Sequence, residues 1–250
     1  MTLIPRTAIA LAAALLLALP AAASAQSFSP DQRHEIENII KDYLIAHPEV
    51  MQDVLASVDR YQKETAAEKT AATIEADKAT LFDSPHQVVL GNPHGSVTAV
   101  EFFDYNCAFC KHALPDMVKL LQSDPNLKFV LKEFPVLGPG SVEAAHVAIA
   151  ARMQDPTGAK YLEFHEKLLG GRGVADLARA LAVAKEVGFN MARIQTDMNS
   201  PEVTTTIDQD MKLADALGVD GTPSYVIGNQ VVVGAIGFDE LKQKIADAEK

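Results

Sequence analysis

Residues 97–111 read VTAVEFFDYNCAFCK and contain both cysteines of the 250-residue chain. The first half, Val97 to Phe103, is rich in β-branched and aromatic residues, which favour a β-strand. An amphipathic helix pattern follows the cysteines, and Leu127 to Phe134 predicts a second strand. Strand, helix and strand in this order form a βαβ unit with a parallel, right-handed crossover, so we expect an α/β fold.

The segments around this unit predict further strands and helices. Val88 to Leu90 is a short strand pattern that precedes the unit. Ser224 to Ile227 and Gln230 to Val233 flank a Gly-Asn pair, as expected for a hairpin. Residues 141–217 are almost entirely helical in pattern, and a last helix is expected from Phe238 toward Ala248.

The two cysteines, Cys107 and Cys110, are three residues apart. A bridge between them would close a very small loop, and the stabilisation from a disulfide grows with loop length. We therefore interpret them as a reactive pair. Cys107 lies where strand gives way to helix, and a helix N-terminus favours the thiolate, which makes Cys107 the nucleophile. Cys110 lies one helical turn later and is the resolving thiol, because it can attack a mixed disulfide formed at Cys107.

A single C-x-x-C motif can also be half of a zinc site. The chain has no second C-x-x-C, so the remaining ligands would have to come from His112 and from scattered histidines. The reactive pair is the favoured interpretation of the motif. We expect no bound metal and no other cofactor.

Two further positions are candidates for the site. Glu101 shares a strand face with Phe103. It is either a buried carboxyl that shuttles protons for the dithiol, or a strand-end acid that reaches solvent or pairs with Lys132. Thr222-Pro223 precedes a strand, where proline is tolerated in either isomer, and the local sequence alone favours the trans form.

Residues 1–25 have the layout of a secretory signal peptide. Arg6 provides a positive start, an apolar run of 12 residues extends from Ala8 to Leu19, and Ala23-Ser24-Ala25 offers a cleavage site. The run is too short to cross a bilayer core of about 30 Å as a helix, although an uncleaved anchor is the alternative. We expect an exported, periplasmic protein.

The net charge of the expected mature chain is strongly negative. Without Arg6 it has 21 basic and 33 acidic residues, a formal charge of −12. This charge argues against nucleic acid or an anionic membrane surface as a partner. It does not indicate a substrate.

The region before the βαβ unit divides into an arm and a linker. Residues 26–61, the arm, show two helix patterns separated at His47-Pro48. Their apolar faces are too small for a stable monomeric domain, so the arm either self-associates or folds back on the rest of the chain. Residues 62–80 are rich in Ala, Glu and Lys with almost nothing to bury, and predict a helical linker to a domain at 81–250.

Four stretches together resemble the DsbA-like branch of the thioredoxin superfamily: Gly91-Asn92-Pro93, residues 100–111, Lys132-Glu133-Phe134-Pro135 and Gly221-Thr222-Pro223-Ser224. The resemblance implies a thioredoxin fold with a helical insertion at about 141–217. It also implies that Pro223 is cis and faces the cysteines, that Thr222 hydrogen-bonds substrate through its backbone, and that Glu101 is the buried acid. Phe109, between the cysteines, is expected at the substrate-binding surface with Thr222 and Pro223.

The arm is similar to that of the suppressor-of-copper-sensitivity C (ScsC) proteins. The likeness rests on Ser29-Pro30-Asp31-Gln32 and on Tyr43-Leu44-Ile45-Ala46-His47-Pro48-Glu49-Val50. Some members of that group are oligomers held together by this arm and act as disulfide isomerases. The likeness implies a homo-oligomer through residues 29–61, with a trimer as one form, and a link to copper tolerance.

The chain departs from the DsbA enzymes between its cysteines. Those enzymes have Pro-His there, whereas this chain has Ala108-Phe109. A phenylalanine cannot donate a hydrogen bond to the thiolate. We therefore expect Cys107 to be less acidic, and the disulfide less oxidising, than in those enzymes. These properties favour isomerase or reductase activity.

The sequence thus predicts a periplasmic thiol–disulfide oxidoreductase, as an isomerase of misfolded exported proteins. A monomeric dithiol oxidase is one alternative. A copper-binding protein that uses Cys107 and Cys110 as soft ligands is another. The expected partners are exported proteins with disulfides or thiols, and a membrane protein that resets the redox state of the cysteines.

Overall fold

A computed structural model describes residues 28–155 and 157–249. The chain divides into two compact units, residues 1–59 and 60–250. The expected signal peptide, residues 1–25, lies outside the described residues. Within the described residues, no helix has both the length and the apolar character needed to cross a membrane.

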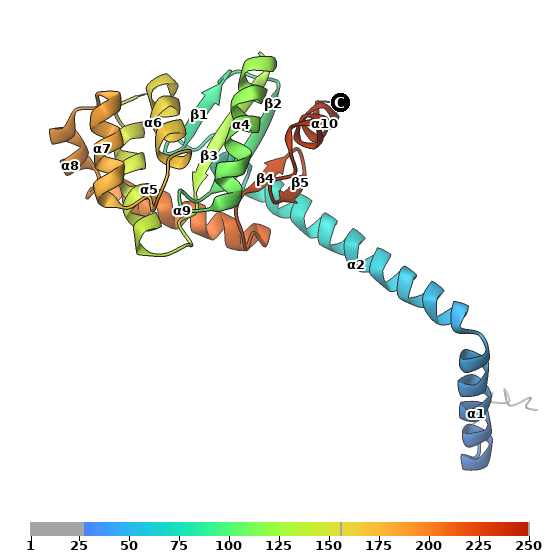
Figure 1. The fold of residues 1–250 in the computed structure, drawn as a ribbon. Coiled ribbons are helices and arrows are strands. Elements are labelled where there is room, and N and C mark those ends of the chain that lie inside the picture. Colours follow the sequence, from blue (N-terminus) through green and yellow to red (C-terminus); the bar gives the residue numbers. More distant parts are fainter. Residues whose placement is uncertain (1–27, 156, 250) are drawn as a thin grey trace, which may run out of the picture. The chain divides into compact units, whose positions relative to one another are not determined.

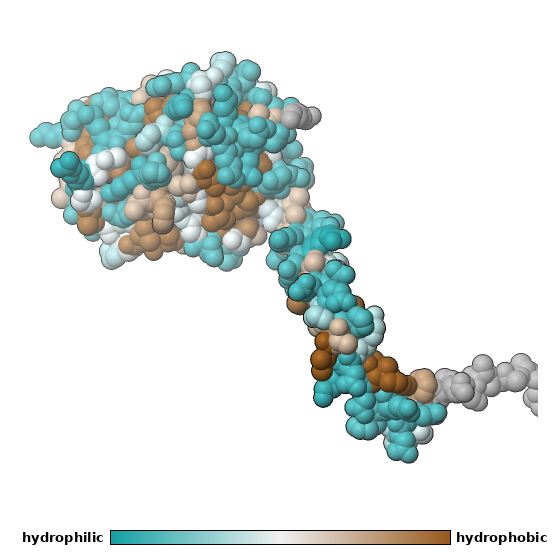
Figure 2. Space-filling model, turned by 45° about the vertical axis from the view of Figure 1, so that its right-hand side comes forward, coloured by the Kyte–Doolittle hydropathy of each residue, from teal (hydrophilic) through white to brown (hydrophobic). Residues whose placement is uncertain are grey.

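The first unit is built from helix α1, Pro30–Ala46, and the start of helix α2, Pro48–Ala76 (Figure 1). Ser29 caps α1 in a capping box with Gln32, and His47 separates the helices where the sequence predicts a break. No residue of α1 is buried. The exposed large apolar residues of the arm are Phe28, Ile36, Ile39, Ile40, Tyr43, Ile45, Met51, Val54, Leu55, Val58 and Tyr61. Figure 2 shows hydrophobic side chains on the surface of these helices.

The second unit contains a five-stranded sheet in the order β1-β3-β2-β4-β5. Its strands are β1 Val88–Gly91, β2 Val97–Phe103, β3 Leu127–Glu133, β4 Ser224–Ile227 and β5 Gln230–Val233. Strands β2 and β3 are parallel, and helix α4, Ala108–Ser123, connects them, which confirms the predicted βαβ unit. The other strand pairs are antiparallel. The sheet with its covering helices is a thioredoxin-like fold of the α/β class.

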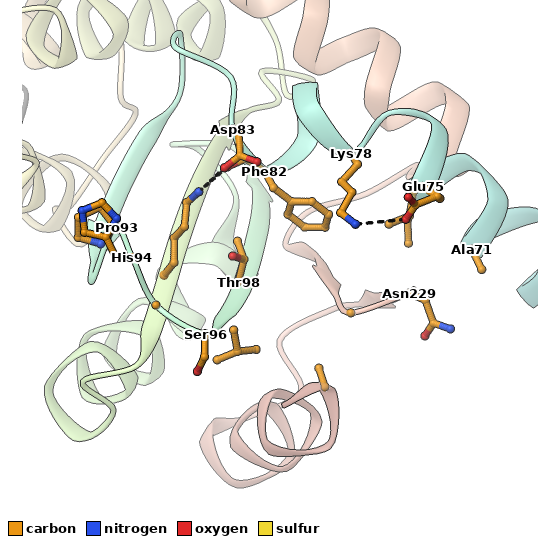
Figure 3. Close-up of a pocket in the computed structure, with 16 residues that line it drawn as sticks. Ala71, Glu75, Lys78, Phe82, Asp83, Pro93, His94, Ser96, Thr98 and Asn229 are labelled. Carbon is orange, nitrogen blue, oxygen red and sulfur yellow. Dashed lines mark hydrogen bonds and ion pairs between the residues drawn. The ribbon is translucent and has the colours of Figure 1, made fainter. Parts of the chain in front are cut away.

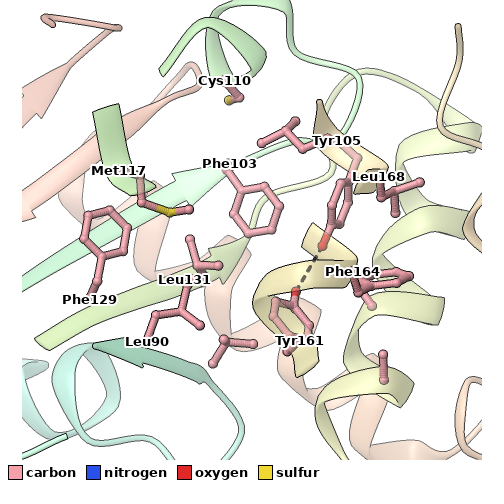
Figure 4. Packing of buried hydrophobic residues seen from close by; sticks show 14 of the residues in the cluster. Leu90, Phe103, Tyr105, Cys110, Met117, Phe129, Leu131, Tyr161, Phe164 and Leu168 are labelled. Carbon is pink, nitrogen blue, oxygen red and sulfur yellow. Dashed lines mark hydrogen bonds between the residues drawn. The ribbon is translucent and has the colours of Figure 1, made fainter. Parts of the chain in front are cut away.

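The two faces of the sheet have separate cores. On one face, Phe103, Phe129 and Leu131 pack with Met117 of α4 (Figure 4). Helix α10, Phe238–Ala248, contributes Leu241 and Ile245 to the same core. Cys110 belongs to this core. On the other face, Val100, Phe102, Val130 and Val226 pack with Leu213 and Leu217 of helix α9, Pro201–Leu217. Strand alternation therefore directs Glu101 toward α4, on the same face as Phe103.

Ile74 corrects the expectation that residues 62–80 have almost nothing to bury. Helix α2 continues to Ala76, and a short helix α3, Lys78–Phe82, follows it. Ile74 and Leu81 are buried in the core that contains Val100. The end of the expected linker is therefore part of the larger unit.

The segment between β3 and β4 is helical, as expected. It contains α5 Pro139–Arg152, α6 Ala159–Leu169, α7 Leu177–Val187, α8 Met191–Asp197 and α9. Sequence patterning missed α8, which has only 7 residues and a single buried side chain, Ile194, and is therefore too short for a clear periodic pattern.

Candidate active site

Cys107 is the N-cap residue of α4 and follows the turn that connects β2 to this helix. Its Sγ accepts a hydrogen bond from the N–H of Cys110 at 3.4 Å and lies 3.1 Å from the carbonyl oxygen of Thr222. The hydrogen bond from the Cys110 side chain lowers the pKa of Cys107 to about 5; the N–H groups of Phe109 and Cys110 act in the same direction, against the effect of burial. Cys107 is therefore a thiolate at neutral pH.

Cys110 has the opposite properties, although it lies only one helical turn away. Its side chain is fully buried, and this burial raises its pKa, with the hydrogen bond to Cys107 and the nearby Glu101 adding to the shift. It therefore remains a protonated thiol while Cys107 is ionised. Both side chains are buried, so the asymmetry between the two thiols lies in the opposite directions of their pKa shifts.

The Thr222–Pro223 peptide bond is cis. The carbonyl oxygen of Thr222 lies against Cys107 Sγ. The structure therefore places this dipeptide, which precedes β4, beside a cysteine that is more than 100 residues away in sequence. Phe109 lies on the first turn of α4 and is 67% exposed, which leaves its ring free to contact another molecule.

Glu101 is buried in β2 beside Tyr225 of β4, which hydrogen-bonds to its carboxyl. Burial raises the pKa of Glu101 to about 8, and the neighbouring Cys107 adds to the shift. The alternative, a pair between Glu101 and Lys132, is wrong, because alternation directs Lys132 to the other face. There Lys132 Nζ lies 3.3 Å from Asp210 Oδ1 and donates to the carbonyl oxygen of Thr80 at 2.8 Å.

A buried polar cluster lies beside the site and was not found from the sequence. The hydroxyl of Tyr105 lies 3.0 Å from that of Tyr161 and 3.3 Å from Nδ1 of His165. Tyr161 in turn donates to Glu133 at 3.2 Å. Burial lowers the pKa of His165 to about 3, so this histidine is neutral at physiological pH. These residues come from the turn after β2, from β3 and from α6, and no local sequence pattern connects them.

An open pocket lies at the other end of the sheet and contains neither cysteine. It has a volume of about 640 Å³ and is lined by residues such as Phe82, His94 and Asn229 (Figure 3). Its lysines are paired, Lys128 with Asp83 at 2.7 Å and Lys78 with Glu75 at 3.4 Å. The reactive site is therefore separate from this pocket.

The residues described by the structure contain no group of three or more His, Cys, Asp or Glu side chains placed to hold a metal ion. The chemistry that the site supports is the exchange of a disulfide through the Cys107 thiolate.

Two family models match the chain. One for the DSBA-like thioredoxin domain matches residues 98–246, and one for the copper resistance protein ScsC N-terminal domain matches residues 32–67. Among curated proteins, the chain is 25% identical over 174 residues to disulfide bond formation protein D of Bacillus subtilis, covering 64% of this chain and 75% of that protein. The chain spans about a quarter (26%) of the length of the first curated relatives it matches, Na⁺/H⁺ antiporters NhaA of two Salinispora species.

Solved structures show the same fold. A thioredoxin-like oxidoreductase from Silicibacter pomeroyi DSS-3 is 44% identical, with a TM-score of 0.64, covering 68% of this chain and 96% of that chain. A linker-deletion variant of ScsC from Proteus mirabilis has a TM-score of 0.68 and covers 90% of this chain and 98% of that chain. Its identity is 21%, so this second likeness concerns the fold alone.

Proposed function

Because the chain belongs to the family of DSBA-like thioredoxin domains, we propose that it is a thiol–disulfide oxidoreductase that acts through Cys107 and Cys110. The observation that carries the proposal is the asymmetry of the two thiols. Cys107 is a helix N-cap with its pKa lowered to about 5, whereas Cys110 is fully buried with a raised pKa.

The first step is attack of the Cys107 thiolate on one sulfur of a substrate disulfide. The substrate S–S bond breaks, a mixed disulfide with Cys107 forms, and the other substrate sulfur leaves as a thiolate. In isomerisation, a second substrate thiolate then attacks the substrate sulfur of the mixed disulfide. Cys107 leaves as a thiolate, and no net oxidation or reduction occurs.

The second step releases a substrate that does not rearrange. Cys110 loses its proton and attacks Cys107 Sγ, so that the substrate leaves as a thiolate and a Cys107–Cys110 disulfide forms. Glu101 is close enough to influence the charge of both cysteines and is the group we assign to accept the Cys110 proton. A membrane redox partner would then reduce the disulfide.

Glu101→Gln tests this role of the carboxyl. In the wild type, the rate of mixed-disulfide resolution should rise with pH until about 8, because only ionised Glu101 accepts a proton. The variant should resolve about 100-fold more slowly, at a rate that does not follow this titration. Stopped-flow quenching with an alkylating reagent measures the step. An unchanged pH profile in the variant would exclude Glu101 as the base.

The same variant has a stability control. The pKa of Glu101 is raised in the folded state, so folding favours the protonated carboxyl. The stability that this preference contributes is complete below the unfolded-state pKa of about 4.3 and is lost as the pH rises toward about 8. Glu101→Gln should therefore be at least as stable as the wild type above pH 5. A slower reaction in the variant then cannot be attributed to unfolding.

Isomerisation is the form of the activity that we propose. The pKa of about 5 at Cys107 lies between the values of about 7 in thioredoxin and about 3.5 in DsbA, which supports the expectation drawn from Ala108-Phe109. The substrates are misfolded exported proteins, and Thr222, Pro223 and Phe109 are the residues assigned to contact them. The location is periplasmic.

Self-association through residues 29–61 is the second part of the proposal. The arm exposes its apolar residues, and a groove of about 540 Å³ in the first unit is lined by Ile40, Leu44, Ile45 and Met51 among others. Contiguous apolar surface that is exposed to water is thermodynamically unfavourable and usually marks an interaction site. A second copy of the arm offers a matching apolar face. Several reactive sites held together suit a substrate with more than one wrong disulfide.

Substitution of Ile40 tests the arm. Ile40→Asp should convert the oligomer to a monomer and reduce refolding of scrambled ribonuclease about tenfold, while oxidation of a small dithiol continues. Light scattering coupled to chromatography measures the mass. Glu64→Gln, an exposed polar change on α2, is the matched control and should alter neither property. A wild-type protein that is already monomeric would contradict the proposal and favour the dithiol oxidase.

A further inference from the structure

Tyr225 of β4 is a buried tyrosine that lies directly opposite Glu101. The two residues are cross-strand partners in the antiparallel pair of β2 and β4, so their side chains leave the sheet on the same face. Tyr225 is 1% exposed and Glu101 is 3% exposed. The Tyr225 hydroxyl hydrogen-bonds to the Glu101 carboxyl. The fold thus places a phenol donor on the carboxyl that we assign as the proton acceptor.

This tyrosine–carboxyl pair lies on the face of the sheet that carries the resolving thiol. Cys110 of α4 is fully buried in the core on that face (Figure 4). Tyr225 belongs to the same core. Glu101 and Cys110 each affect the charge of Tyr225, and Glu101 affects that of Cys110. The hydroxyl is therefore bonded to the carboxyl at the place where the Cys110 proton must be accepted.

The other neighbours of the pair are acidic or apolar. Cys107 and Cys110 come from the start of α4, and Asp116, half-buried on the same helix, is close enough to affect Tyr225. The adjacent strands and α10 contribute apolar side chains, namely Leu131, Val232, Leu241 and Ile245. Because a negative charge is unfavourable in such surroundings, the carboxylate depends on the hydrogen bond from Tyr225.

The tyrosine remains a hydrogen-bond donor while the carboxyl titrates. Burial raises the pKa of Tyr225 above its usual range, and the nearby acids act in the same direction. Burial and the Cys107 charge raise the pKa of Glu101 to about 8, and the hydrogen bond from Tyr225 opposes them. Removal of the hydroxyl should therefore raise the pKa of Glu101 further, so that this residue becomes a base only at higher pH.

We propose that Tyr225 is a positioning residue whose hydroxyl holds the Glu101 carboxyl beside Cys110 and stabilises the carboxylate that accepts the Cys110 proton. This inference rests on the proposed thiol exchange and on the role of Glu101 in it. In the resolving step the Cys110 proton passes to Glu101, the Cys110 sulfur bonds to Cys107 Sγ, and the substrate leaves as a thiolate. The Tyr225 hydroxyl keeps its own proton throughout. It sets the pH range in which the step is fast.

The test follows both steps with an aromatic disulfide that releases a coloured thiolate, thionitrobenzoate, when it reacts with the reduced protein. A first phase of colour appears when Cys107 forms the mixed disulfide, and a second when Cys110 resolves it. In the wild type, the rate of the second phase should rise with pH to a midpoint near 8. Stopped-flow absorbance between about pH 6 and pH 10 covers the Glu101 titration on both sides.

Tyr225→Phe removes one oxygen and keeps the buried ring, so the core remains filled. The midpoint of the second phase should move up by about one pH unit, because a hydrogen bond to the carboxylate is lost. At pH 7 the second phase should slow about three- to tenfold, and it should recover the wild-type rate above the new midpoint. The rate of the first phase should stay within about twofold of the wild type.

Tyr161→Phe is the matched control. Tyr161 is also 1% exposed and lies in the same core, and its hydroxyl donates to another buried carboxyl, that of Glu133, at 3.2 Å. The control therefore removes the same atom from a different carboxyl. The midpoint of its second phase should stay within about 0.3 pH unit of the wild type.

A second comparison uses the Glu101→Gln variant. Adding Tyr225→Phe to it should change the resolving rate by less than about twofold, because the carboxyl through which Tyr225 acts is absent. The inference would be overturned by a wild-type midpoint in Tyr225→Phe, by an equal shift in Tyr161→Phe, or by a loss of rate that is the same at every pH. A wild type that shows no first phase would overturn the proposed thiol exchange itself, and this inference with it.

Discussion

Cys107→Ser should lower thiol–disulfide exchange by about three orders of magnitude or more, to the uncatalysed rate, because the variant has no thiolate nucleophile. Cys110 should not substitute for the lost thiol. Its side chain is fully buried, and that burial raises its pKa, so it is neither accessible nor ionised. The reduction of insulin by dithiothreitol, with and without the protein, measures the loss.

Two substitutions of Cys110 separate its roles. Cys110→Ser and Cys110→Ala should both accumulate mixed disulfides at Cys107, which mass spectrometry detects as covalent adducts. They should differ in the pKa of Cys107, because the side-chain hydrogen bond from Cys110 is the largest cause that lowers it. A hydroxyl retains a donor and a methyl group does not, so alkylation of Cys107 should titrate at higher pH in Cys110→Ala. Adducts that form at Cys110 in Cys107→Ser would reverse the assignment.

Lys132→Met should lower the free energy of unfolding by about 3–5 kcal/mol, because it leaves one member of a buried ion pair without its partner. The side chains of Lys132 and Asp210 are 1% and 4% exposed, and their charged atoms lie 3.3 Å apart. Asp210 also accepts from the N–H of Glu133 at 3.1 Å, so the pair connects β3 to α9. Burial lowers the pKa of Lys132 and raises that of Asp210 to about 6.

Urea unfolding of the full-length protein measures this effect. The double variant with Asp210→Leu should recover much of the loss, since replacing both members of a buried pair by apolar groups is often neutral. Lys167→Met is the control, because Lys167 pairs with Glu186 at 2.7 Å on the surface, where solvent screens an ion pair and leaves it little effect on stability. An equal change in the free energy of unfolding for Lys132→Met and Lys167→Met would mean that the Lys132 pair does not stabilise the fold.

The sequence predicted the elements whose patterns are local. The βαβ unit, the hairpin after Pro223, the break at His47 and the helical segment before β4 are all confirmed, since strand and helix periodicity is a property of neighbouring residues. The short helix α8 was missed because its 7 residues are too few for a clear pattern, and the buried Ile74 was missed because one apolar residue in a polar stretch does not make one. The burial of Glu101 was one of two alternatives, and the structure decided between them, because Glu101 is buried beside Tyr225 and Lys132 lies on the opposite face.

The sequence by itself determined the spacing on which the proposed reactive pair rests, because two cysteines one helical turn apart can serve as nucleophile and resolving thiol, and that spacing is read directly from Cys107 and Cys110. The resemblance to a known family added the expectation for Pro223, for which the local sequence favours the other isomer. The tertiary structure alone decided which groups surround the thiols: Thr222 beside Cys107, Tyr225 beside Glu101, and Ala175 held by Asn106. These contacts join residues about 70 to 125 positions apart in the chain, so they arise only when the sheet and helices pack, and they decide the acidity and the surroundings of the cysteines.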